Sequence, residues 1–557
     1  MATFLAGLRA LLPSTEDYRG LRTSWRADLI AGLTVGIVAL PLALAFGVSS
    51  GVGAEAGLIT AIVAGLVAAI FGGSNVQVSG PTGAMVVVLA PIVVVHGVGA
   101  VAVVSIMAGI LVLAAGILRL GRAVSYIPWP VIEGFTAGIG IIIFLQQVPA
   151  AVGVSGLDTS SNAVIAAGQV IAAATWPDAL LPLAAVAAVA LVMLLLGRFV
   201  PRIPASFAAI LIVSVVAALA GSPLATIGEL PQSLPAPSLP TFDLTMLSAL
   251  AGPAAAVAAL AAIESLLSAR VAATIADTGH VNADRELFGQ GLASVASGFF
   301  GGMPATGAIA RTAVNVRSGA RTRLSAIVHA LALLLVVLVA SQVVGAIPLA
   351  ALAGVLMMTA ARMVSPATIG RVLRSSRSSI AVFAITLFVT VAFDLVIAVG
   401  IGLAAAAFFA LRTLSNMSAA AREPLPGDPA PGDERIALFT VHGSLFFGAA
   451  DRIVEQISEA PDVSVVILRL SDVQIIDATG ANALADLVLA LERRGVTVLM
   501  KGVRPEHRGM LEKLGVIDSL RHPNHLFEHL EPAIHHARDH VRREASGEHA
   551  PEPGTQH

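Results

Sequence analysis

Apolar residues follow one another almost without pause from Asp28 to Leu411, as in the runs Leu180–Leu196 and Ile327–Val344. A helix that crosses the ~30 Å hydrocarbon layer of a bilayer needs ~20 mostly apolar residues. The runs lack the strict alternation of polar and apolar residues that is typical of membrane β-barrel strands. When they are divided at their polar, glycine and proline interruptions, they predict about fourteen helical membrane segments, some shorter than a full span.

The pattern changes after Arg412. Residues Ser418–Glu434 are polar and rich in proline, which predicts a linker. Strand-like and helix-like segments then alternate, which predicts a small α/β domain. The expected strands are Ile436–Leu445, Val463–Leu470 and Val496–Met500, and the expected helices are Ala478–Leu491 and Pro505–Leu514.

These changes set the expected domain boundaries. We expect a cytoplasmic N-terminal segment over residues 1–27, a membrane domain over 28–412, a linker over 413–434, the α/β domain over 435–543 and a disordered tail over 544–557. From Ala533 onward the chain is rich in His, Arg and Glu, which predicts a solvated helix that frays into the tail. A metal site is not expected there, because His535, His536 and His540 lack a ligand framework.

The positions of the basic residues predict the orientation in the membrane, since loops rich in Lys and Arg stay in the cytoplasm. The connections 149–178 and 221–246 carry acidic residues but no Lys or Arg. Arginines instead flank the opposite ends of the apolar runs, namely Arg9, Arg19, Arg22, Arg26, Arg119, Arg122, Arg198, Arg202, Arg317, Arg321, Arg323, Arg362, Arg371, Arg374, Arg377, Arg412 and Arg422. We therefore expect a multi-pass protein of the cell (inner or plasma) membrane with both termini in the cytoplasm.

The composition excludes several classes of protein. Of the 557 residues, 56% are hydrophobic and 12% are charged, about half the charged share of a typical soluble domain. The net charge of −2 gives nucleic acid no attraction, and the absence of cysteine excludes disulfides and thiolate metal sites. Nucleotide-binding loops, metal-ligand clusters and Ser/His/Asp arrangements are also missing from the sequence, so we expect neither an enzyme nor a bound cofactor.

The membrane domain contains an internal repeat. Phe71–Gly73 (FGG) is followed by Pro81–Ala84 (PTGA), and Phe300–Gly302 (FGG) is followed by Ala305–Ala308 (ATGA). Each copy falls near the third segment of a seven-segment half, and the two halves cover residues of about 28–221 and 247–412. Because seven is odd, the second half is expected to enter the membrane with inverted topology.

Both copies of the repeat interrupt apolar runs, and irregular backbone is tolerated inside a membrane only where it is buried in protein or lines a cavity. Val76–Ser79 is expected to be extended, with one half-helix after Pro81 and another from about Ala308. Two opposed half-helix N-termini offer free N–H groups and about +0.5 charge each, which favours an anion. The alternative is that glycine and proline only permit kinks and tight helix packing.

Two ionisable residues lie at membrane depth, where charge is costly and usually functional. Arg311 lies about one turn into the second half-helix, where its guanidinium suits a carboxylate, bicarbonate or sulfate. Glu264 lies within the apolar run Ala254–Ala273, with Ser268 on the same helix face, and this pair suits a coupling proton or Na⁺. The alternative for both charges is that Arg311 only neutralises Glu264.

The chain resembles the SulP anion-transporter family, whose animal members form solute carrier family 26. The resemblance covers nearly the whole chain and rests on the motifs Ala39–Gly47, Phe71–Gly73, Ser79–Gly83, Glu264–Ser268, Glu286–Gly291 and Ala308–Asn315. The C-terminal domain resembles a STAS domain at Ile476–Gly480. The resemblance implies fourteen segments in two inverted seven-segment repeats, a core domain and a gate domain, a homodimer, and elevator-like movement of the core against the gate.

The family's binding residues carry over by position. Thr82, Gly83 and Ala84 provide the first half-helix N-terminus of the implied anion site, and Thr306, Gly307 and Ala308 provide the second, with Arg311 beside them. Glu264 and Ser268 match positions at which bicarbonate-transporting relatives bind Na⁺. The acid here is Glu instead of Asp, and Arg270–Ala273 also departs from the family pattern, so coupling to H⁺ and coupling to Na⁺ both stay open.

The STAS turn has two interpretations. Soluble relatives are phosphorylated on a serine here, and only Thr479 of this chain can take that role. Alternatively, Asp477 and Thr479 cap the helix that follows. The domain then serves dimerisation or regulation, with a nucleotide or a regulatory partner as its ligand.

We therefore expect secondary active transport of a small anion of the sulfate, bicarbonate or C4-dicarboxylate class, coupled to H⁺ or Na⁺. An uncoupled exchanger or channel is the alternative, because it needs the same anion site but no coupling carboxylate. A membrane-tethered regulator is a third hypothesis, which the paired half-helices disfavour. The expected partners are the anion, the lipid bilayer and a second copy of the chain.

Overall fold

The computed structural model describes residue 9 and residues 11–546, apart from 123–126, 158, 161, 201–202, 242–243, 278, 280, 394, 447–449 and 459–462. Contacts divide the chain into two compact units, Met1–Ala406 and Ala407–His557. Of the residues used above, Arg202 and the expected tail beyond Ser546 lie outside the described residues.

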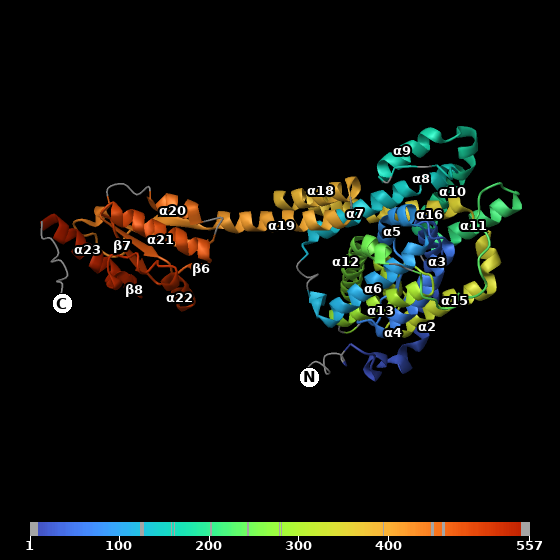
Figure 1. Cartoon of the computed structure of the whole chain (residues 1–557), viewed down its shortest axis with the longest axis horizontal. Helices are drawn as coiled ribbons and strands as arrows, with labels where there is room; N and C mark the ends of the chain where they lie inside the picture. The colour runs from blue at the N-terminus through green and yellow to red at the C-terminus, as the bar shows by residue number, and fades with distance from the viewer. Residues whose placement is uncertain are drawn as a thin grey trace. The chain divides into compact units, whose positions relative to one another are not determined.

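The membrane part of the chain is helical (Figure 1). Over the described residues, eight helical stretches are long and apolar enough to cross a membrane. They are α2 (Leu21–Ser49); α3 (Ala54–Ile59) continued by the π-helical turn η2 (Thr60–Ala64) and α4 (Gly65–Phe71); α6 (Gly99–Ile117); α7 (Trp129–Gln146) with α8 (Val148–Val152); α10 (Trp176–Phe199); α12 (Leu244–Ile275); α15 (Leu324–Gly345); and α16 (Leu349–Met363) with α17 (Pro366–Leu373). The other helices are α5 (Gly83–His96), α9 (Ala163–Ala173), α11 (Ala205–Leu219), α13 (Ala283–Phe299), α14 (Ile309–Arg317), α18 (Arg377–Ala392) and α19 (Leu395–Met417). These long and short helices confirm the predicted polytopic fold.

The two copies of the repeat have the same local structure. In the first, α4 is followed by the two-residue strand β1 (Ser79–Gly80) and then by α5, which begins at Gly83. In the second, α13 is followed by β2 (Thr306–Gly307) and then by α14, which begins at Ile309. The strands pair antiparallel, Ser79 with Gly307 and Gly80 with Thr306. The predicted half-helix starts are therefore confirmed. The extended segment predicted over Val76–Ser79 overlaps β1 at Ser79, and the strand β2 was not predicted.

Glycines allow the helices of this unit to approach closely. The helices α6 and α13 lie side by side (Figure 1), and a Cβ atom on Gly109 would lie 2.7 Å from the Gly291 carbonyl oxygen. A Cβ atom on Gly116 would lie 2.6 Å from the backbone nitrogen of Phe288. Lipid supplies no hydrophobic force between helices, so such backbone approach is what gives them close packing.

The second unit contains a six-stranded sheet, as predicted for the C-terminal α/β domain. The order β3-β4-β5-β7-β8 joins β3 (Ala419–Glu423), β4 (Ile436–Leu445), β5 (Val465–Arg469), β7 (Thr497–Lys501) and β8 (Leu526–Phe527), and β6 (Val473–Ile476) pairs with β4. Only the pairing of β3 with β4 is antiparallel. The helices α20 (Ala450–Ser458), α21 (Ala478–Arg493) and α22 (Pro505–Lys513) share one apolar core with the sheet, and α23 (Leu530–Ser546) shares another (Figure 1).

The structure corrects two boundary predictions. The segment expected as a linker over 413–434 contains the end of α19 and the strand β3, a half-exposed edge strand. The helix α23 continues to Ser546, so residues 544–546 are helical, and its apolar stripe Ala533, Ile534, Ala537 and Val541 is buried instead of solvated. The buried face of α23 was not predicted, because most residues of this helix are polar and only one narrow face is apolar.

The N-terminal segment is tied through Asp17 to the ends of the membrane helices nearest to it. Its carboxylate accepts two hydrogen bonds of 2.8 Å from Arg285 and lies 3.6 Å from Arg323. These arginines also donate to carbonyl oxygens near the end of α4, at Phe71 and Ala69. Burial raises the pKa of Asp17, but the hydrogen bond from Arg285, the Ser14 amide and the two guanidinium charges together lower it to about 2.

We predict that Asp17→Asn lowers the free energy of unfolding by about 2–4 kcal/mol, because it leaves two buried guanidinium groups without their anion. A carboxyl group with a lowered pKa stabilises the fold above pH ~4 and loses this effect as the pH falls toward 2. The difference in thermal midpoint between Asp17→Asn and the wild type should therefore shrink on acidification. Glu16→Gln is the matched control, since its pair with Arg19 is exposed. Equal midpoints for the two variants would contradict this assignment.

Candidate functional site

The antiparallel pair β1–β2 brings the two half-helix N-termini together. Thr82 is the N-cap residue of α5, and Ala308 is the N-cap residue of α14. All six residues expected at these N-termini are buried: Thr82, Gly83, Ala84, Thr306, Gly307 and Ala308. The backbone amides at the start of both helices therefore converge on one place in the protein interior.

Glu264 of α12 lies at this convergence. Its Oε2 atom accepts a 2.8 Å hydrogen bond from the hydroxyl of Thr82, and the hydroxyl of Thr306 also interacts with its carboxylate. One carboxylate thus contacts the N-terminal residue of α5 and the strand that precedes α14. The residue predicted for coupling lies among those predicted for the anion.

Arg311 is buried, with 2% of its surface exposed. One terminal nitrogen donates to the carbonyl oxygen of Pro81, just before α5. The other has no hydrogen-bond partner among the described residues and lies against Gly80, where a Cβ atom would be 2.8 Å away. Arg311 and Glu264 attract one another electrostatically, but their nitrogen and oxygen atoms form no ion pair within 4 Å. The guanidinium is therefore held at the site without being bound by that carboxylate.

Ser268, expected to form one site with Glu264, has other partners. Its hydroxyl donates to Thr312 over 3.1 Å, and Thr312 accepts a 3.1 Å hydrogen bond from the amide of Val78. The adjacent Ser265 accepts a 3.0 Å bond from the amide of Gly307. Serines of α12 thus fix both strands and α14. Ser265 and Thr312 were not predicted as site residues, although they belong to the family motifs Glu264–Ser268 and Ala308–Asn315.

A second buried carboxylate, Glu286 of α13, organises the approach to β1. It accepts hydrogen bonds of 2.8 and 3.1 Å from the amides of Gly73 and Ser74, and bonds of 2.8 and 3.0 Å from the side chains of Gln77 and Gln290. Four donors hold the carboxylate, so it is fully engaged. Glu286 belongs to a family motif but was not predicted as a site residue; its role here is to position the extended segment that leads into β1.

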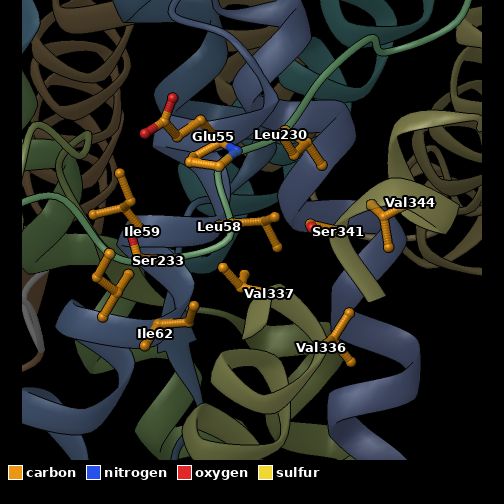
Figure 2. Close-up of a pocket in the computed structure, with 12 residues that line it drawn as sticks. Glu55, Leu58, Ile59, Ile62, Leu230, Ser233, Val336, Val337, Ser341 and Val344 are labelled. Atoms are coloured by element: carbon orange, nitrogen blue, oxygen red, sulfur yellow. The ribbon is translucent and has the colours of Figure 1, made fainter. Parts of the chain in front are cut away.

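A separate pocket is lined by residues of α3 and η2 whose side chains do not face β1 (Figure 2). Leu58, Ile59 and Ile62 line it, whereas Thr60 donates to Met303 and Ala61 lies beside Gly80. Apolar side chains from α15 and from residues 230–234 complete the lining, with Glu55, Ser233 and Ser341 as its polar members. The pocket contains none of the predicted site residues.

In the second unit, Asp477 is the N-cap residue of α21. Its Oδ1 atom accepts a 2.7 Å hydrogen bond from the amide of Gly480, as capping requires. Thr479 is exposed in the first turn of the same helix. Of the C-terminal histidines, His540 lies 3.0 Å from the hydroxyl of Thr497, and His536 packs against His525.

Comparisons with known proteins agree with this architecture. The model of the Sulfate permease family matches residues 25–386, and that of the STAS domain matches residues 429–533. The chain is 33% identical over 518 residues to YvdB of Bacillus subtilis, covering 91% of this chain and 96% of that protein. It is 31% identical to the bicarbonate transporter BicA of Synechocystis, covering 88% and 90%.

The structure of the murine anion transporter Slc26a9 in its inward-facing state is similar in fold. It aligns with a TM-score of 0.80 at 17% identity, over 96% of this chain and 95% of that one. The family model covers well over half of the chain, and the relatives match it across both units. The chain therefore belongs to the Sulfate permease family of anion transporters, with a STAS domain after its membrane part, and not to a family of enzymes.

Proposed function

We propose that the chain is a secondary active transporter whose substrate, a small oxyanion, binds between the N-termini of α5 and α14. The observation that carries this proposal is the β1–β2 pairing, which brings two sets of helix N-terminal amides and Arg311 to one buried place. Backbone amides and a guanidinium are the donors that bind a carboxylate, bicarbonate or sulfate. The family and the bicarbonate transporter BicA support anions of the sulfate and bicarbonate class, and C4-dicarboxylates share the same chemistry.

Glu264 gives this site a means of coupling. When ionised, its carboxylate engages the threonines at both half-helices and acts as an internal anion. A proton or Na⁺ bound to it neutralises that charge and leaves the amide dipoles and Arg311 to the substrate. Uptake of the cation and of the anion then favour one another, as symport requires. An uncoupled exchanger or channel remains the alternative function.

The helix packing supports movement of one group of helices against another. One group contains α2, α4, α6, α12, α13, α14 and α15, and a second contains α7, α10, α11, α16 and α18. The candidate site is formed by α12 and α14 of the first group and by the N-terminus of α5, which packs on helices of both groups. An elevator-type displacement of the first group together with α5 would carry the site with it. The arginine distribution supports cytoplasmic termini, and we place the protein in the cell membrane as a homodimer with a regulatory STAS domain.

We predict that Arg311→Gln lowers sulfate or bicarbonate uptake into proteoliposomes about 10- to 100-fold, because it removes a charge-assisted donor worth ~1.5–3 kcal/mol. The measurement is uptake of labelled sulfate, bicarbonate, fumarate and succinate by the full-length protein. Arg317→Gln on the same helix is the control, since Arg317 is exposed, and its uptake should match the wild type. Full uptake by Arg311→Gln would exclude Arg311 from the site.

We predict that Glu264→Gln strongly lowers the stimulation of uptake by an inward H⁺ or Na⁺ gradient, because glutamine keeps the shape but neither titrates nor carries charge. Each gradient is imposed separately at a clamped membrane potential, with Glu55→Gln as the control. A wild-type flux that responds to neither gradient would instead identify an uncoupled exchanger or channel. Stimulation that survives undiminished in Glu264→Gln would place coupling elsewhere.

A further inference from the structure

One buried titratable residue of the membrane unit has no part in the site described so far. His329 of α15 has no exposed surface, and neither of its ring nitrogens has a hydrogen-bond partner among the described residues. A buried polar group without a partner costs about 1–3 kcal/mol. A leucine or methionine would fill the same volume without that cost, so the ring needs another explanation.

Gly65 of α4 lies close both to the His329 ring and to the strand that leads into α5. A Cβ atom on Gly65 would lie 3.8 Å from His329 Cε1, the carbon between the two nitrogens, and 3.3 Å from the carbonyl oxygen of Ser79. A Cβ atom on Gly80, the next residue of β1, would be 2.8 Å from the unpartnered nitrogen of Arg311 and 3.3 Å from Ala61. Ala61 and Gly65 are four residues apart, so they are neighbours on one helix face.

His329 and the unpartnered nitrogen of Arg311 thus both lie near the contact between β1 and the helical segment formed by η2 and the start of α4. The turn η2 is a π-helix, a widened turn that occurs often at functional sites. Burial of the His329 ring disfavours a positive charge on it, and the positive charge of Arg311 adds a second, smaller effect in the same direction. An anion that neutralises Arg311 removes this second effect.

The other charged groups on surrounding elements have their own partners or lie at a distance along the helices. Asp28 of α2 accepts hydrogen bonds from Thr322, Glu286 of α13 is held by four donors, and Arg323 interacts with Asp17. Glu264 is bound by Thr82. Glu55 of α3 lines the pocket that also contains Ser341, which is three turns beyond His329 on α15. The segments η2, α4 and β1 contain no titratable side chain.

We propose that His329 is a proton-binding residue of the transport cycle, which takes up a proton when an oxyanion binds between α5 and α14 and releases it when the anion leaves. The proposal rests on the proposed anion site. The anion neutralises the charge of Arg311, which favours a positive charge on the ring, and the protonated ring in turn attracts the anion. By reciprocity, each ligand raises the affinity for the other by the same factor. The proton comes from the external solution and is released to the cytoplasm with the anion.

The first test measures sulfate uptake by the full-length protein in proteoliposomes, with external pH between about 5.5 and 8 at clamped membrane potential. Sulfate stays a dianion over this range, so a pH dependence reports on the protein. We expect acid outside to stimulate the wild type about tenfold. This stimulation should be strongly reduced in His329→Gln and His329→Asn, which still exchange sulfate at symmetric pH. Ser341→Ala, on the same helix, should keep it. Undiminished stimulation in both His329 variants would overturn the proposal.

A second measurement does not depend on transport. The Cε1–H resonance of His329, assigned by its absence in His329→Gln, reports protonation of the ring in the full-length wild type. We expect added sulfate or bicarbonate to shift its titration toward higher pH. A ring that keeps one protonation state between pH ~5 and ~8, with and without these anions, would overturn the proposal. If the wild type exchanges neither anion at symmetric pH, the proposed function fails, and the resonance still decides whether His329 binds a proton.

Discussion

The membrane unit depends on one short antiparallel pairing, that of Ser79–Gly80 with Thr306–Gly307. Two strands of two residues satisfy backbone groups that would otherwise be unpaired at membrane depth, where each costs several kcal/mol. The pairing also fixes where α5 and α14 begin. Because those helices start directly after the strands, their N-terminal amides meet at a single place, and the binding chemistry follows from the backbone before any side chain is considered.

The carboxylates of Glu286 and Glu264 have different roles in this arrangement. Glu286 accepts hydrogen bonds from four donors and fixes the segment before β1. Its carboxylate therefore has a structural role. Glu264 has a single hydroxyl donor from Thr82 and an interaction with Thr306, so it contacts the residues that a substrate would need. The difference in the number of donors separates a structural carboxylate from one that can exchange its partner. The proposed coupling uses this difference.

Hydrophobic runs and paired Gly/Pro interruptions were sufficient to predict the helices, the repeat and the starts of both half-helices. Isolated charges at membrane depth likewise pointed to Arg311 and Glu264. The sequence could not show that Ser268 bonds to Thr312, since i,i+4 spacing gives a shared face but no partner. Nor could it identify Asp17, whose partners lie more than 250 residues away. The strand β3 was missed because a half-exposed edge strand carries no apolar pattern.

The proposed function requires that an oxyanion binds between the two half-helix N-termini. Selenate has the shape and charge of sulfate, and its selenium atom can be located by anomalous scattering in crystals of the full-length protein. We expect one strong peak within hydrogen-bond distance of the first amides of α5 and α14, near Thr82 and Ala308. A peak in the pocket lined by Leu58 and Ile62, with none between the half-helices at saturating selenate, would contradict it.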